Sequence, residues 1–159
     1  MIFEYYQPYL DISLKIKKDI LHNIYQILEQ HSPNEFGGIF LGKVDTKNSA
    51  AEITQVLIPE KYEQTETSFK RYSDDLNNKI EDIFKKDTSI KFLGEWHSHP
   101  FNSPIPSETD YLAMLKLSEQ ESISLKTPIL LIVSFNKNMS FSPRFYIMYK
   151  NKFYPYESL

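Results

Sequence analysis

The chain has 159 residues, 41% of them hydrophobic and 25% charged, with a formal net charge of −3, so we expect residues 1–159 to form one globular domain. It contains no cysteine, which excludes disulfides, thiolate metal sites and a cysteine nucleophile. Scattered lysines, and the lack of a signal peptide or a long apolar run, predict a cytoplasmic protein that binds neither nucleic acid nor membrane.

The first half of the chain predicts two helices and a pair of strands. Apolar residues three or four apart predict an amphipathic helix over 12–30, capped by Ser13 and ended by residues 32–34. The segments expected to follow are strands at 36–41 and 51–58 with a turn at 45–49, an exposed polar loop at 60–70, and a helix at 74–85.

The second half again mixes strands and helices. The expected elements are a strand at 90–97, a proline-rich loop at 100–106, a helix at 108–117, a strand at 129–134, and a closing hairpin of 142–149 and 152–155 around Lys150-Asn151. This order predicts the α+β class, with a central, mostly antiparallel sheet flanked by helices.

The segment that ends the strand at 90–97 carries a candidate metal site. His97 and His99 are two residues apart and therefore point to the same side of an extended strand. The loop at 100–106 turns the chain back, so Asp110 in the next helix is the candidate third ligand. Two imidazoles and one carboxylate are a ligand set for catalytic zinc, with a fourth position open to water.

A structural alternative exists for part of this pattern. Ser107 and Asp110 are three residues apart at the start of the predicted helix, which is the spacing of a capping box. Capping explains the serine and the aspartate, but not two histidines on one face at the end of a buried strand. The two roles are compatible, because a hydroxyl at a helix start can also face a metal.

A zinc hydrolase also needs a carboxylate to take a proton from the attacking water. Glu95 lies on the same strand face as His97 by alternation, whereas Glu35 leads into an apolar, glycine-rich strand. A carboxylate at the edge of such a strand is costly to bury, so both are candidates and the residues alone do not choose. His22 and His31 are expected to be solvated, with no role.

Three segments together resemble the motif of the JAMM (JAB1/MPN/Mov34) metalloprotease family, and are most similar to its prokaryotic JAB branch. They are Glu35-Phe36-Gly37-Gly38-Ile39-Phe40-Leu41-Gly42, Gly94-Glu95-Trp96-His97-Ser98-His99-Pro100 and Ser107-Glu108-Thr109-Asp110. The resemblance implies the cytidine-deaminase-like fold of that family and one Zn²⁺ per chain. It implies that His97, His99 and Asp110 hold the zinc. It further implies that Glu35 is the general base acting through zinc-bound water, and that Ser107 donates a hydrogen bond to the oxyanion.

The resemblance also implies a substrate class. Relatives cleave isopeptide or peptide bonds after the tail of a ubiquitin-like protein, in deconjugation or precursor processing. E1/E2-like operon partners and a role in anti-phage defence would follow. The alternatives are a peptidase that processes a sulfur carrier and a noncatalytic interaction module. Residues 62–72 are the candidate flap over the substrate tail, and Glu95 is a candidate for a residue near the ligands or the substrate.

Overall fold

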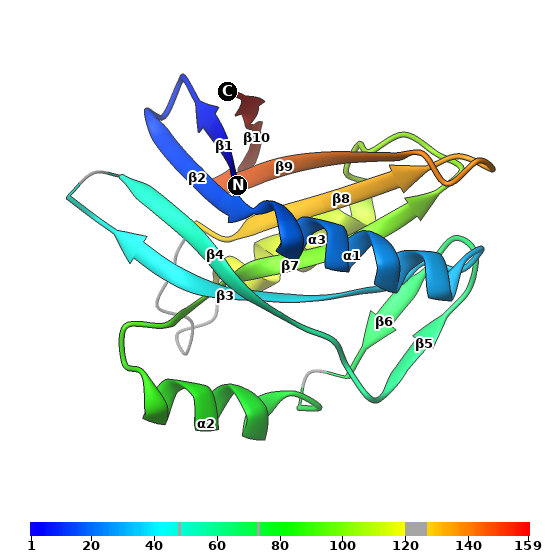
Figure 1. The fold of residues 1–159 in the computed structure, drawn as a ribbon, viewed down its shortest axis with the longest axis horizontal. Helices are drawn as coiled ribbons and strands as arrows, with labels where there is room; N and C mark the ends of the chain where they lie inside the picture. Colours follow the sequence, from blue (N-terminus) through cyan, green and yellow to red (C-terminus); the bar gives the residue numbers. More distant parts are fainter. Residues whose placement is uncertain (48, 73, 120–126) are drawn as a thin grey trace.

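The computed structural model describes residues 1–47, 49–72, 74–119 and 127–159. Its largest element is a nine-stranded sheet with the order β10-β9-β8-β7-β3-β4-β2-β1-β11 (Figure 1). Its strands are β1 (Ile2–Gln7), β2 (Ile12–Lys17), β3 (Gly37–Asp45), β4 (Ala50–Leu57), β7 (Lys91–Pro100), β8 (Ile129–Phe135), β9 (Phe141–Tyr149), β10 (Lys152–Pro155) and β11 (Glu157–Ser158). The helices are α1 (Lys18–His31), α2 (Asn77–Lys86) and α3 (Glu108–Ser118), and a separate hairpin comprises β5 (Tyr62–Gln64) and β6 (Phe69–Arg71).

Most neighbouring strands of the large sheet are antiparallel, and β2 with β4 and β7 with β8 are the parallel pairs in the described part of the chain. The C-terminal segment pairs with β9 through β10 and with β1 through β11, so it joins the two edges of the sheet. Tyr156, between these two strands, is buried. The predicted class, a mostly antiparallel sheet flanked by helices, is confirmed.

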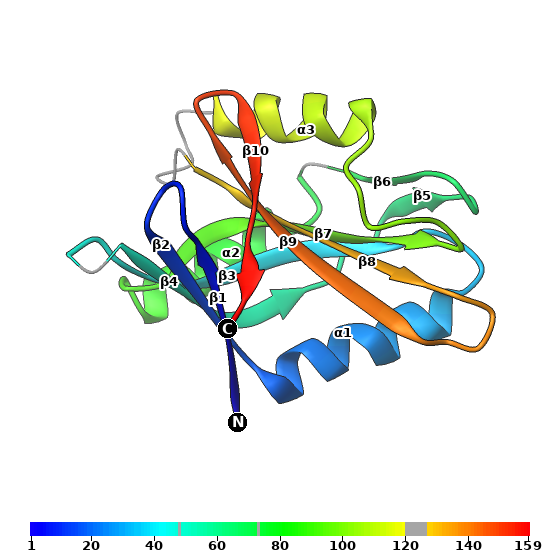
Figure 2. The ribbon, with the colours of Figure 1, turned by 90° about the horizontal axis from the view of Figure 1, so that it is seen from above.

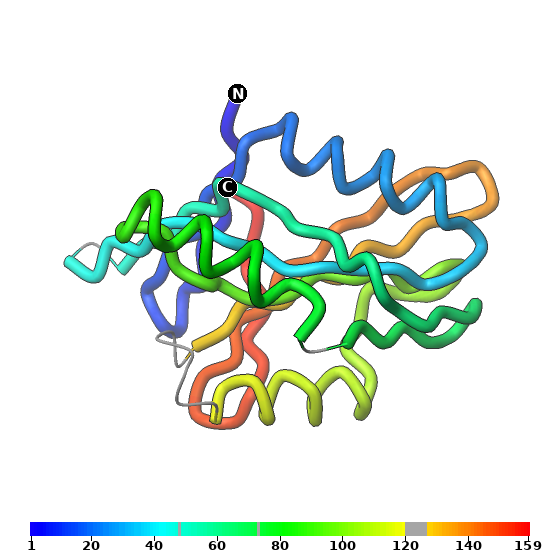
Figure 3. The backbone as a smooth tube through the Cα atoms, turned by 90° about the horizontal axis from the view of Figure 1, so that it is seen from below, coloured from blue at the N-terminus to red at the C-terminus, as the bar shows by residue number. Residues whose placement is uncertain are grey.

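The helices cover both faces of the sheet. Leu131 of β8 packs in one core with Leu28 of α1, while its neighbour Leu130 packs in a second core with Met114 of α3. Because neighbouring residues of a strand face opposite sides, α1 and α3 lie on opposite faces, as Figure 2 shows. Helix α2 packs on Ile39 of β3 in a third core; it lies below the sheet in Figure 1, and Figure 3, seen from below, shows it in front of the strands. No helix among the described residues has the length and apolar character needed to cross a bilayer.

The N-terminal end of the predicted helix is wrong, because residues 12–17 form β2 and the helix begins only at Lys18. Leu14 and Ile16 are completely buried and two residues apart, which is the period of a strand. The isoleucines of this segment also have the four-residue spacing of a helix, so periodicity did not separate the two structures. Ser13 lies within β2 and does not cap α1, and the pairing strand β1 was not expected.

The segment at 60–70 is also not the loop that its polarity predicted. Tyr62 to Gln64 and Phe69 to Arg71 pair as an antiparallel hairpin. The sequence hides this hairpin because only Tyr62 and Phe69 are apolar, and both pack against the main core. The other strand predictions hold approximately, including the closing hairpin around Lys150-Asn151. Residue 48 of the predicted turn at 45–49 lies outside the described residues.

Candidate metal centre

Strand β7 brings two imidazoles to one point. His97 and His99 are partly buried on the same side of the strand, and their Nε2 atoms are 3.2 Å apart. Ser98 between them faces the other side and is completely buried. Alternation along the strand therefore separates two ligand candidates from one structural residue.

The carboxylate of Asp110 reaches both imidazoles. Its Oδ1 lies 3.1 Å from Nε2 of His97, and its Oδ2 lies 3.1 Å from Nε2 of His99. The capping box is present as well: the Ser107 hydroxyl accepts a hydrogen bond from the Asp110 backbone N–H, and the Ser107 N–H donates to Asp110 Oδ2. The cap orients Asp110 toward the histidines, so capping and assembly of the site are one arrangement.

The separations of these donor atoms fit a divalent ion such as zinc. Ligands at about 2.0–2.1 Å in tetrahedral geometry lie about 3.3–3.4 Å from one another. The nitrogen–nitrogen and nitrogen–oxygen separations here are 3.2 and 3.1 Å. Two imidazole nitrogens and a carboxylate, with no thiolate, are donors that zinc accepts. Small movements outward would accommodate an ion bound by these three side chains.

Surrounding contacts orient the donors. The backbone carbonyl of Ser103 lies 3.0 Å from Nδ1 of His99, which leaves Nε2 to face the site. Burial tends to lower the pKa of His99, but its contacts with Asp110 and Ser103 outweigh burial and raise that pKa. Burial likewise tends to raise the pKa of Asp110, but the hydrogen bonds from both imidazoles hold it far below the usual range. Asp110 is therefore an anion, the form in which a carboxylate binds metal.

Glu35 lies beside the histidines because the start of β3 is joined to β7. Gly37 pairs with His97, and just before it the N–H of Phe36 donates to the Ser98 hydroxyl, while the Ser98 N–H donates to the Phe36 carbonyl. One carboxylate oxygen of Glu35 and one ring nitrogen of each histidine lie within 4.8 Å of one another, so these three side chains could also hold a metal. Sequence reasoning missed Ser98; its signal is a small polar residue on the buried face between two histidines.

The two candidate bases lie in different environments. Glu35 is 8% exposed, and burial raises the pKa of its carboxyl, partly offset by the charges of His97 and His99. Glu95 instead accepts a hydrogen bond of 2.9 Å from Nη2 of Arg71 in β6, within an ion pair. The structure thus places Glu35 at the histidines and engages the Glu95 carboxylate with the hairpin.

His31 has contacts that sequence reasoning did not predict. It is partly buried at the end of α1, and its ring stacks on Phe36 with centroids 3.6 Å apart. Its Nδ1 lies 3.3 Å from Oε1 of Gln64 in β5. The expectation that His31 is solvated is wrong, whereas His22 is exposed as expected. Nothing in the sequence signals the contact with Gln64, because the hairpin itself was not predicted.

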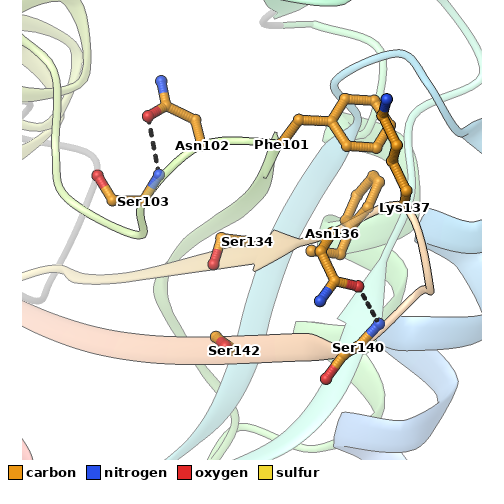
Figure 4. Close-up of a pocket in the computed structure, with 9 residues that line it drawn as sticks. Phe101, Asn102, Ser103, Ser134, Asn136, Lys137, Ser140 and Ser142 are labelled. Atoms are coloured by element: carbon orange, nitrogen blue, oxygen red, sulfur yellow. Dashed lines mark hydrogen bonds between the residues drawn. The ribbon is translucent and has the colours of Figure 1, made fainter.

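A polar pocket adjoins the loop that follows His99 (Figure 4). Its lining residues are Phe101, Asn102, Ser103, Ser134, Phe135, Asn136, Lys137, Ser140 and Ser142. The backbone of this loop is held by Phe101, whose N–H donates to the Phe135 carbonyl at 2.8 Å. Six of these nine residues carry a hydroxyl or an amide side chain, and two are phenylalanines.

Comparison with known proteins identifies the family. A family model of prokaryotic homologs of the JAB domain matches residues 17–145. The chain therefore belongs to this family of JAB-domain proteins, and the resemblance read from the sequence motifs is confirmed.

Two individual proteins are similar to the chain. A protein of Enterobacter hormaechei subsp. hoffmannii (strain UCI 50), named CD-NTase/cGAS isopeptidase, is 30% identical over 118 residues. The match covers 70% of this chain and 64% of that protein, so this chain spans less than two thirds of the relative's length. A solution structure of a Desulfitobacterium hafniense protein has a TM-score of 0.61 at 19% identity, covering 91% of this chain and 88% of the other, and shows the same fold.

Proposed function

We propose that this chain is a zinc-dependent isopeptidase or peptidase that cleaves after the C-terminal tail of a ubiquitin-like protein. The observation that carries the proposal is the convergence of two histidines and an aspartate, with the buried Glu35 beside them. Family membership and the isopeptidase name of the relative support it. That name also favours a conjugate in a CD-NTase system as the substrate.

In this proposal each side chain has a separate role. The zinc ligands are His97, His99 and Asp110. Asp110 is the preferred third ligand because its two oxygens lie 3.1 Å from the two Nε2 atoms, which leaves Glu35 free to act as base. A bound zinc ion would polarise the scissile carbonyl and lower the pKa of water.

Glu35 then handles the proton. Its carboxylate accepts a proton from the attacking water and passes it to the leaving amine when the carbon–nitrogen bond breaks. Burial raises its pKa, which increases its basicity. The Ser107 hydroxyl can donate to the developing oxyanion while its oxygen accepts the Asp110 N–H, because a hydroxyl has one donor and two acceptor sites. Such a donor lowers the activation barrier by about 3 kcal/mol.

The test uses a fluorescence-quenched peptide that ends in glycine and is joined by an isopeptide bond to the ε-amine of lysine. We expect Glu35→Gln to keep wild-type zinc content and lose at least about 100-fold in kcat, because it removes only the base. Glu29→Gln, an exposed change on α1, is the matched control. His97→Ala should lose zinc, whereas His22→Ala should not.

Each result decides between functions. A wild-type protein that binds no zinc would favour an interaction module. If Glu35→Gln binds zinc and keeps wild-type activity, Glu35 is not the general base. E1- or E2-like genes beside this gene would favour deconjugation, and cysteine-synthesis genes would favour the sulfur-carrier alternative.

A further inference from the structure

The backbone of Glu35 is held by the β5–β6 hairpin. Glu35 precedes β3, so its peptide groups are outside the ladder of the large sheet. Its N–H donates to the backbone carbonyl of Thr65 at 2.8 Å, and its carbonyl accepts from Nε2 of Gln64 at 2.9 Å. The backbone N–H and carbonyl of Glu35 are therefore both hydrogen-bonded to two consecutive residues, Gln64 and Thr65.

The side chain of Gln64 also contacts His31 at the end of α1. Its Nε2 donates to the Glu35 carbonyl at 2.9 Å, and its Oε1 and Nε2 lie 3.3 and 3.4 Å from Nδ1 of His31. The amide nitrogen carries two hydrogens, so Nε2 can donate to the Glu35 carbonyl whichever amide atom His31 contacts. Because the His31 ring also stacks on Phe36, the end of α1, the hairpin and residues 35–36 form one connected unit.

The other arm of the hairpin is attached to the strand that carries the histidines. Arg71 of β6 forms its ion pair with Glu95, two residues before His97, and both side chains are largely buried, at 18% and 27% exposed. Tyr62 packs edge-on against Phe36 with ring centroids 5.0 Å apart. The hairpin thus contacts both Glu35 and β7, in addition to the direct pairing of β3 with β7.

We propose that Gln64 is a positioning residue for the hydrolytic reaction: its amide fixes the backbone of Glu35 and so places the carboxylate relative to His97 and His99. This inference rests on the function proposed above. A base must lie within hydrogen-bond reach of the proton it takes, and a displacement of about 1 Å can cost about 100-fold in rate. Gln64 acts through Glu35 and does not touch the reacting atoms.

The test replaces the amide with a side chain of similar length that cannot donate. We expect Gln64→Met to lower kcat about 10- to 100-fold while KM and zinc affinity stay within twofold of wild type. Hydrogen exchange at the Glu35 amide should become at least about tenfold faster, since the bond from its N–H to the Thr65 carbonyl would then hold Glu35 to these hairpin residues without the bond from Gln64. Gln30→Met, the same change at an exposed position on α1, should alter none of these quantities.

A second variant keeps the proposal falsifiable if Gln64→Met folds poorly. His31→Phe keeps an aromatic ring on Phe36 but removes the contact with Gln64, and we expect a smaller loss of kcat with unchanged KM. The double variant should be no slower than Gln64→Met, because both changes act on the same contact.

The outcomes separate this inference from the proposed function. A wild-type protein without hydrolysis would contradict the function, and exchange at the Glu35 amide would still test the hairpin contact. Wild-type kcat in Gln64→Met, or unchanged exchange at Glu35, would overturn the positioning role. A loss of zinc affinity in Gln64→Met that accompanies the loss of kcat would also overturn the positioning role, since the contact would then support the metal ligands.

Discussion

A methyl group added at Gly37 tests how closely β3 supports the metal centre. Gly37 pairs with His97, and a Cβ built on it would lie 2.2 Å from the Trp96 carbonyl oxygen and 2.8 Å from the His97 Cβ. Carbon–oxygen contacts between strands are about 3.3 Å or longer, so β7 must move away by about 1 Å. Functional sites tolerate about 0.5 Å, so Gly37→Ala should misplace the His97 ring.

We expect Gly37→Ala to lower zinc affinity about 10- to 100-fold and the free energy of unfolding by about 1–3 kcal/mol. Competition with a chromogenic chelator measures the first, and urea unfolding of the zinc-free protein measures the second. Gly42→Ala is the matched control: its Cβ would lie 1.9 Å from the Glu52 carbonyl oxygen, but Gly42 pairs with Lys91, six residues before His97. It should destabilise the fold and leave zinc affinity unchanged. Zinc affinity within twofold of wild type in folded Gly37→Ala would refute this reasoning.

Two further variants test the ligand set and the hairpin. The side chain in Asp110→Asn can still accept a hydrogen bond from the Ser107 N–H, so α3 keeps its cap. Its zinc affinity should nevertheless fall at least about tenfold. A chelator that lowers the melting temperature of the wild-type protein should therefore no longer lower that of the variant. Unchanged affinity would mean that Asp110 is not a ligand, and a loss in Glu35→Gln would then identify Glu35 as the third donor. Arg71→Ala should lower the free energy of unfolding by about 1 kcal/mol in a urea titration, because it leaves the partly buried Glu95 carboxylate unpaired. Adding Glu95→Gln to Arg71→Ala should recover part of this loss. An unchanged free energy of unfolding in Arg71→Ala would show that the ion pair does not anchor the hairpin.

The sequence predicted the parts of the fold whose patterns are unambiguous. The apolar run that forms β8 is buried throughout, and its length of seven residues is typical of a buried strand. The prediction for residues 12–17 was wrong because Ile12, Leu14 and Ile16 have the two-residue spacing of a strand, while the isoleucines alone have the four-residue spacing of a helix. Pairing with β1 and β4 decided between the two structures. The β5–β6 hairpin was not predicted because tertiary contacts of Tyr62 and Phe69, rather than a local sequence pattern, stabilise it.

The same division applies to the site. Strand alternation and helix capping are local, so the sequence alone determined that His97 and His99 share a face and that Asp110 follows a cap at Ser107. Local patterns did not determine which carboxylate lies beside the histidines. Glu35 is 62 residues before His97, and the two are brought together by the pairing of β3 with β7 and by the buried Ser98. Tertiary structure likewise decided that Gln64, from a segment without a recognisable pattern, holds the backbone of Glu35. Short-range geometry is encoded by residue spacing, whereas contacts across the sheet depend on which strands become neighbours.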